Sequence, residues 1–166
     1  MYYINCFFIY AFLGFIFENI IGIISNNNFD SGILYGPITL VYGFGCIIIL
    51  IISKYLFKRL HLPRWIETFI VAIILIVILS ILEFIGGITI ETIFGIVFWD
   101  YSNYKYNIGK YVSLEISIFW GILAIILIYV VHPLLNKLIV KIPHYITYIA
   151  MLLFIIDITI TLITKT

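Results

Sequence analysis

The sequence predicts an all-α membrane protein, a polytopic bundle of five transmembrane helices that forms one domain over residues 1–166. Its 166 residues are 64% hydrophobic and 10% charged, whereas a soluble domain carries about 25% charged residues. The apolar residues also gather in runs of roughly 20, the length that crosses about 30 Å of hydrocarbon. A soluble protein of this size could not bury so much apolar surface, so soluble classes are excluded.

The first span is predicted over residues 4–24. A signal peptide is disfavoured there, because no Lys or Arg precedes the apolar run and no small-x-small cleavage site follows it. Gly14, Glu18 and Gly22 recur every four residues and therefore share one helix face. Small residues on such a face allow another helix to approach closely.

A polar loop over residues 25–35 carries Asp30, and the second span is predicted over residues 36–53. Gly36-Pro37 suits the start of this helix, since proline is tolerated in a first turn. The next segment, 54–65, is the strongest basic cluster of the chain. Its bases are Lys54, Lys58, Arg59 and Arg64.

The third span is predicted over residues 66–85, with a less purely apolar extension to residue 98. Gly86-Gly87 could kink or end this helix, which leaves the extension as helix, interfacial segment or re-entrant segment. If the segment stays helical, one narrow stripe carries polar and small residues at helical spacing. These residues are Ser80, Glu83, Gly87 and Glu91.

The fourth span is predicted over residues 113–131, with His132-Pro133 at its end, and the fifth over residues 145–163. One side of the fifth span carries polar and small residues, Asp157 among them. The two cysteines, Cys6 and Cys46, fall inside apolar runs, so no disulfide framework is indicated.

Lys and Arg near the span ends predict the orientation in the membrane. With five spans, the loops 54–65 and 132–144 lie on the same side as the N-terminus and carry six bases. The other side carries three, Lys105, Lys110 and Lys165. We therefore expect a cytoplasmic N-terminus and an outside C-terminus in the cytoplasmic membrane.

This topology places seven of the eight acidic residues on the outer side, with Glu67 as the exception. A carboxylate inside a membrane is costly and marks a functional hypothesis by default. We expect five of these acids to converge in one binding site that also includes two aromatic residues. The predicted substrate- or cation-binding residues are Glu18, Glu83, Glu91, Asp100, Asp157, Trp99 and Tyr101.

Each feature also has a structural explanation. Buried carboxylates can pair with Lys or with hydroxyl groups inside the bundle, and the aromatic residues between Trp99 and Tyr111 can form an interfacial belt. The basic residues Lys58, Arg59 and Arg64 are typical of a topology signal near anionic lipid, and we expect them to contact headgroups or a cytoplasmic protein. His61, His132 and His144 lack carboxylate partners at ligand spacing, so no metal site is predicted.

Sequence motifs of known chemistry are absent. The chain contains no GxxxxGK[ST], HExxH, GxSxG or CxxC sequence, so it shows no P-loop for nucleotide and no cofactor site. No nucleophile–base pair appears at a fixed spacing either. These absences disfavour an enzyme. No nucleic-acid partner is expected.

Several separated blocks resemble one family. They are FIYAFLGFIFENI, GILYGPITLVYGFG, LEFIGGITIETIFGIVFWDYS, SIFWG and YVVHPLL, between about Phe8 and Leu135. Together they are similar to the putative ABC-transporter type IV family, small bacterial membrane proteins described as ABC transporter permeases. The family's Gly-Trp-x-x-Glu motif matches at Gly14 and Glu18, with Phe15 in place of Trp. Further matches are Glu83, Glu91, Trp99, Asp100, Tyr101, Ser102, Trp120, Gly121, His132 and Pro133.

The resemblance implies a membrane transport component that works with a separate cytoplasmic ATPase. Five short spans enclose little volume, so a homo-oligomer or a hetero-complex is expected. Two alternatives stay open: an accessory or regulatory membrane protein without transport activity, and an intramembrane lipid-active enzyme that uses the carboxylates. A co-purifying ATPase favours the transport component, and carboxylate-dependent lipid turnover favours the lipid-active enzyme.

Overall fold

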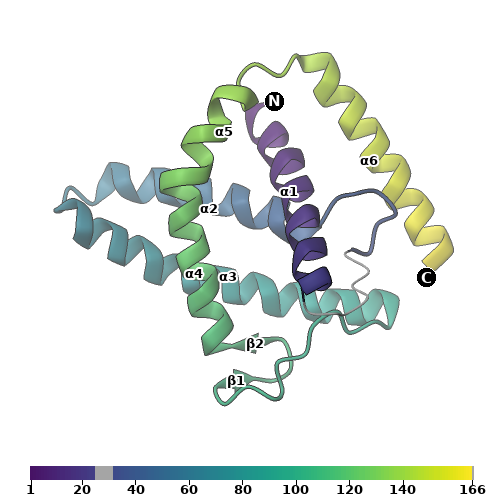
Figure 1. Cartoon of the computed structure of the whole chain (residues 1–166), viewed down its shortest axis with the longest axis horizontal. Coiled ribbons are helices and arrows are strands. Elements are labelled where there is room, and N and C mark those ends of the chain that lie inside the picture. The colour runs from purple at the N-terminus through teal and green to yellow at the C-terminus, as the bar shows by residue number, and fades with distance from the viewer. Residues whose placement is uncertain (25–31, 166) are drawn as a thin grey trace. The chain divides into compact units, whose positions relative to one another are not determined.

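The structure, a computed structural model, describes residues 1–24 and 32–165 (Figure 1). Most of the predicted polar loop, with Asp30, lies outside the described residues. Within them, five helices are long and apolar enough to cross a membrane, which confirms the predicted fold class. They are α1 (Tyr2–Ile24), α2 (Leu40–Arg59), α3 (Arg64–Phe94), the continuous Leu114–Ile139 segment and α6 (His144–Lys165).

Helix α3 resolves the question of the extension after residue 85. It runs without a break across Gly86-Gly87 and ends at Phe94. Gly95 then adopts the left-handed conformation, with φ of 66°, and its N–H donates to the carbonyl of Glu91. Glycine is the usual residue in this helix-ending position because it has no Cβ to clash. The helix therefore continues for 31 residues, about 46 Å, and exceeds the thickness of the hydrocarbon.

The fourth span does not end at His132-Pro133, so that prediction is wrong. Helix α4 (Leu114–Ile126) passes into the π-helical segment η1 (Leu127–Val131) and then into α5 (His132–Ile139). A proline ring clashes with the carbonyl four residues earlier in an α-helix. The wider π turn ends at Val131, just before Pro133, and such a local change lets a helix continue past a proline ring.

The second span begins later than predicted, at Leu40 instead of Gly36, and it ends at Arg59 instead of residue 53. The residues before α2 use their backbone groups in other contacts. Thr39 N donates to the carbonyl of Ala11 at 3.1 Å, and Gly36 N donates to the Asp157 carboxylate at 2.9 Å. These bonds hold the segment against α1 and α6, and so they set the start of α2.

The chain divides into two compact units, residues 1–47 with 135–166, and residues 48–134. In the first unit, Gly43 of α2 lies against the ring of Phe7 and the methyl of Ala11 in α1. Thr147 of α6 donates to Asn5 Oδ1 of α1 at 2.6 Å, between two buried side chains. The prediction of a single domain over residues 1–166 stays a prediction.

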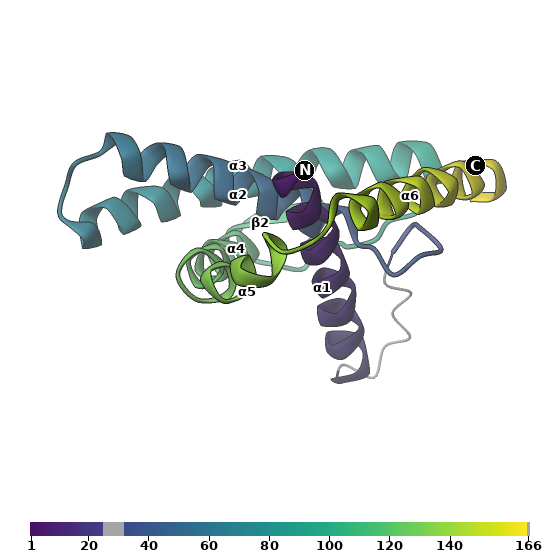
Figure 2. The same ribbon diagram turned by 90° about the horizontal axis from the view of Figure 1, so that it is seen from above.

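In the second unit, the core joins the C-terminal half of α2 to α3 and α4. Ile49, Val71, Leu75 and Ala124 are buried together there. Figures 1 and 2 both show the end of α2 and the start of α3 side by side, joined by a short turn. This core fixes α3 relative to α4 and therefore positions the polar stripe of α3.

A short antiparallel hairpin leads into α4. Its strands are β1 (Asn107–Ile108) and β2 (Val112–Ser113), and Ile108 pairs with Val112. Ser113 then caps α4, because its hydroxyl accepts a hydrogen bond from Ile116 N. This N-cap satisfies a backbone donor at the start of the helix.

Many large apolar side chains are exposed along the helices. On α6 alone, Leu152, Leu153 and Ile155 are each close to 60% exposed. Apolar surface on this scale is unfavourable in water, whereas in a bilayer it contacts lipid tails. The exposure therefore supports an integral membrane protein.

Candidate functional site

The predicted polar stripe of α3 exists, and each of its residues meets a partner in the same unit. Ser80 donates to Ser117 Oγ of α4 at 2.6 Å. The ring of Tyr111 lies directly on Gly87, so an added Cβ would overlap it. The Lys110 ammonium donates to Glu91 Oε1 at 2.6 Å. The stripe is therefore the surface on which α4 and the loop after α3 pack.

Glu83 lies at the centre of this stripe and is 6% exposed. Its Oε1 accepts hydrogen bonds from Tyr101 Oη at 2.9 Å and from Trp120 Nε1 at 3.1 Å. Its Oε2 is buried and has no hydrogen-bond partner among the described residues. A carboxylate has about four acceptor positions, so Glu83 keeps acceptor capacity that these neighbours do not fill.

The loop between Gly95 and Ser113 is held against α3 by its aromatic residues. Trp99 Nε1 donates to the Tyr111 carbonyl at 3.2 Å, and Tyr101 N donates to the Lys110 carbonyl at 2.8 Å. Tyr111 is buried, and its Oη has no hydrogen-bond partner in the described part of the chain. Tyr101 and Tyr111 thus contact α3, whereas Tyr104 is exposed.

Asp100 lies in the same loop, but it is not buried as Glu83 is. Its side chain is exposed and accepts a hydrogen bond from Ser102 N at 2.8 Å. Hydrogen bonds from Ser102 hold the pKa of Asp100 below its ordinary value, and the nearby Lys110 charge lowers it further. An ionised Asp100 therefore stabilises this loop turn.

In the first unit, Asp157 of α6 holds the segment that precedes α2. Its Oδ1 accepts from Tyr35 N at 3.0 Å and its Oδ2 accepts from Gly36 N at 2.9 Å. Thr161 also donates to Oδ1, at 3.4 Å. Both oxygens of Asp157 are therefore occupied by donors, two of them from the backbone.

Glu18 occupies the face of α1 that the glycine spacing predicted. The ring of Tyr42 lies on Gly14, where a Cβ would overlap it, and its hydroxyl donates to Glu18 Oε1. The small residue thus admits the ring, and the ring carries the hydroxyl one turn further along α1. This contact confirms that Gly14 allows α2 to approach α1 closely.

The predicted site residues therefore fall into two sets. Glu83, Glu91, Trp99, Asp100 and Tyr101 belong to the second unit, where Tyr101 and Glu83 meet directly. Glu18 and Asp157 belong to the first unit and have separate partners. Convergence of the two sets stays a prediction. Among the described residues, no group of three or more His, Cys, Asp or Glu could hold a metal ion.

The predicted site residues did not include three residues that contact the stripe, Trp120, Tyr111 and Ser117. Ser117 and Trp120 lie three residues apart and so share the face of α4 that meets α3. That spacing could have identified Trp120 as a donor to the α3 stripe. Tyr111 had no such signal, because its burial depends on the path of the loop.

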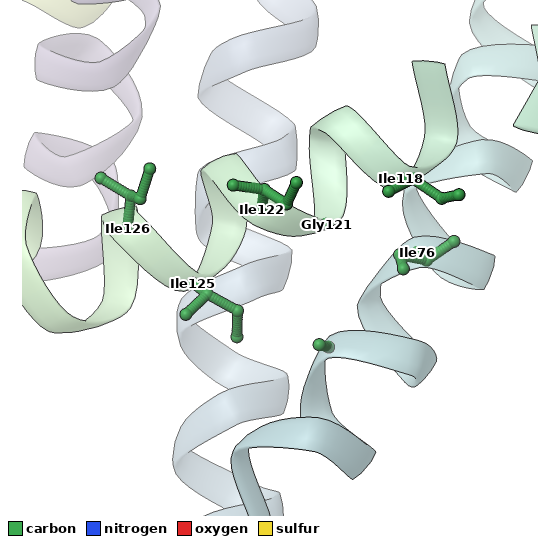
Figure 3. A pocket seen from close by; sticks show the side chains of 7 residues that line it. Ile76, Ile118, Gly121, Ile122, Ile125 and Ile126 are labelled. Atoms are coloured by element: carbon green, nitrogen blue, oxygen red, sulfur yellow. The ribbon is translucent and has the colours of Figure 1, made fainter. Parts of the chain in front are cut away.

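A groove of about 250 Å³ also lies between α3 and α4, lined by apolar side chains. Gly121 lies directly against Ile76, and Ile118, Ile122 and Ile125 line the rest (Figure 3). No polar side chain lines it. The groove is therefore separate from the hydrogen bonds of Glu83 with Tyr101 and Trp120.

The predicted basic contact residues lie at the turn between α2 and α3. Lys58 and Arg59 end α2, and Arg64 begins α3. Arg64 pairs with Glu67 at 3.2 Å, and Glu67 Oε1 accepts from Leu62 N at 3.1 Å. This acid therefore stabilises the turn that presents the bases.

Comparison with known proteins adds a family. No curated protein and no solved structure matches the chain. One family model does match, over residues 5–163, and its description is Putative ABC-transporter type IV. This range covers the five apolar helices except Tyr2–Ile4 of α1 and Thr164–Lys165 of α6, and it includes both sets of acidic residues. The chain therefore belongs to the Putative ABC-transporter type IV family.

Proposed function

We propose that this chain is the membrane-embedded component of an ABC-type transporter and works with a separate ATPase subunit. The observation that carries the proposal is the family match over residues 5–163, together with five apolar helices in the described residues. The sequence has no GxxxxGK[ST] motif, so nucleotide hydrolysis requires another subunit. Five spans enclose little interior volume, and a homo-oligomer or hetero-complex completes the pathway.

The proposed ligand site is acidic, lies on the outer side and binds a cation or a cationic substrate. Glu83 is its centre, with Tyr101, Trp99, Glu91 and Asp100 in the same unit. The support is the burial of Glu83 and its Oε2, which lacks a hydrogen-bond partner among the described residues. A buried carboxylate without sufficient partners is costly, and a cationic ligand would offset that cost.

Purification from the native membrane in mild detergent tests the proposal. The tagged chain should recover a subunit with a P-loop, identified by mass spectrometry, and the complex should hydrolyse ATP. Glu83→Gln should abolish the stimulation of ATP hydrolysis by substrate without loss of the complex. Glu115→Gln is the matched control, because Glu115 is an exposed acid in the first turn of α4.

Two results would contradict the proposal at different points. Recovery of the pure chain without any P-loop subunit would favour the accessory membrane protein. Equal stimulation of ATP hydrolysis by substrate in the Glu83 and Glu115 variants would contradict the proposed acidic site. It would not contradict the transport role.

The proposed orientation has the N-terminus in the cytoplasm and the C-terminus outside. Both native cysteines are buried and can be replaced before single cysteines are introduced. A membrane-impermeant maleimide added to intact cells should label a cysteine at Asn103 but not one at Lys58, both exposed positions. Labelling at Lys58 from outside would reverse the orientation.

A further inference from the structure

We propose that the tip of the α2–α3 hairpin, residues 54–65, binds the phosphate headgroups of anionic lipids. This inference goes beyond the transport role and does not depend on it. It begins with charge. Between residues 31 and 82 the sequence has four bases, all within the tip, and one acid, Glu67.

Glu67 does not neutralise the exposed bases of the tip, because its buried carboxylate bonds within the turn. It is 5% exposed, and its two oxygens accept from Leu62 N and from Arg64 Nη1. The backbone also bends here, with His61 at a φ of 44°. The acid therefore fixes the turn and occupies one base, which leaves Lys54, Lys58 and Arg59 exposed without an opposing carboxylate in the described hairpin.

The arginines of the tip are held in place by aromatic rings. The Arg59 guanidinium lies 4.8 Å from the centre of the Tyr55 ring, and that of Arg64 lies 5.4 Å from the centre of the Phe57 ring. Guanidinium groups match phosphate oxygens in a bidentate geometry. A guanidinium already positioned over a ring loses less conformational freedom when it binds phosphate.

The apolar and aromatic exposure of the tip distinguishes a lipid surface from a purely polar partner. Trp65 is 75% exposed and Tyr55 is 55% exposed. Trp and Tyr favour the interface between headgroups and hydrocarbon. Helix α2 has 20 residues, about 30 Å of helix, which is the hydrocarbon thickness. Lys58 and Arg59, in its last turn, therefore reach the level of the lipid phosphates.

Native mass spectrometry of the detergent-solubilised full chain tests this inference, with phosphatidylglycerol and phosphatidylcholine as probes. The wild type should bind phosphatidylglycerol more tightly. Lys54→Gln, Lys58→Gln and Arg59→Gln together should reduce that preference by about fivefold for each charge, on the order of a hundredfold at low salt. Arg64 is left unchanged because it supports the turn through Glu67.

The matched control removes the same three charges elsewhere, with Lys105→Gln, Lys137→Gln and Lys141→Gln, all at exposed positions. It should keep the preference for phosphatidylglycerol. Equal loss in both triple variants would show a general charge effect and overturn the proposal. Loss of a co-purifying ATPase from the tip variant, with the lipid preference intact, would assign the tip to a protein partner.

A measurement on the wild-type protein tests the proposal even if the variants misfold. Screening is much stronger in about 1 M salt than in about 0.01 M salt, because the Debye length falls from about 30 Å to about 3 Å. The preference of the wild type for phosphatidylglycerol should therefore decrease as salt rises. A preference that is absent, or that does not change with salt, would contradict the proposal. Neither outcome bears on the acidic site at Glu83.

Discussion

Asp157 and Glu83 are carboxylates on helices, and each accepts hydrogen bonds from other segments of the chain. The two differ in the kind of donor. Asp157 accepts two backbone N–H groups, from Tyr35 and Gly36. Glu83 accepts from two side chains, Tyr101 and Trp120, both at one oxygen. Backbone donors are fixed by the fold, whereas side chains can change rotamer and partner.

The difference separates a structural carboxylate from a carboxylate that can take a ligand. Both oxygens of Asp157 are occupied, so a ligand at this position would have to displace the segment before α2. Glu83 has a second oxygen without a partner among the described residues. The same reasoning from membrane cost selected both acids, and the hydrogen-bond partners distinguish them.

The largest expected effect comes from the two adjacent glycines of α3. Gly87→Ala should destabilise the protein by about 3 kcal/mol, because the new methyl overlaps the Tyr111 ring in a packed site. Gly86→Ala should stabilise it by about 0.5–1 kcal/mol, since alanine favours the helix and the nearest atom, of Trp99, would lie 3.9 Å away. Reversible unfolding in mixed detergent–SDS micelles measures both. Effects of the same sign would mean that the loop does not pack on α3 as described.

The next effect compares the same chemical change at the two acids. Asp157→Asn should cost about 2 kcal/mol, because one oxygen becomes an NH₂ group that faces a backbone N–H donor. Unfolding in the same micelles measures the cost. Asp157→Glu, which restores both acceptors on a longer side chain, should recover part of the stability. A cost below that of Glu83→Gln would contradict the structural role of Asp157.

Glu83→Gln should cost less than about 1 kcal/mol. The amide oxygen can still accept from Tyr101 and Trp120, and the NH₂ group would replace Oε2, which has no donor among the described residues. Under the proposed function, this variant loses substrate response while it stays folded. Loss of the folded protein in the same unfolding assay would instead make Glu83 a purely structural residue.

The sequence could predict the parts of this molecule that depend on local pattern. Long apolar runs identified the five spans, and helical spacing identified the stripe of Ser80, Glu83 and Gly87. Partners distant in sequence could not be read in this way. Trp120 lies 37 residues from Glu83, and Gly36 lies 121 residues from Asp157. Whether both oxygens of a carboxylate have hydrogen-bond donors depends on which residues the fold brings close to it. A local sequence pattern does not contain that information.

The smallest expected effect concerns the pH dependence of the loop over α3. Hydrogen bonds from Ser102 lower the pKa of Asp100 from its ordinary 3.8. A carboxyl whose pKa is lower in the folded state stabilises that state when ionised. The contribution is therefore fully present above the unfolded pKa and is lost as pH falls through the lower folded value.

Tryptophan fluorescence can follow this change, because Trp99 lies next to Asp100 and its Nε1 bonds to the Tyr111 carbonyl. The wild-type signal should be constant above about pH 5 and change only below the ordinary Asp range. In Asp100→Asn, the amide oxygen can still accept from Ser102 N, but the group cannot ionise, so this step should disappear. Glu91 also pairs with Lys110 in this region, and Glu91→Gln should leave the Asp100 step in place. A step that follows Glu91 instead would mean that the ion pair, and not the Ser102 turn, holds the loop closed.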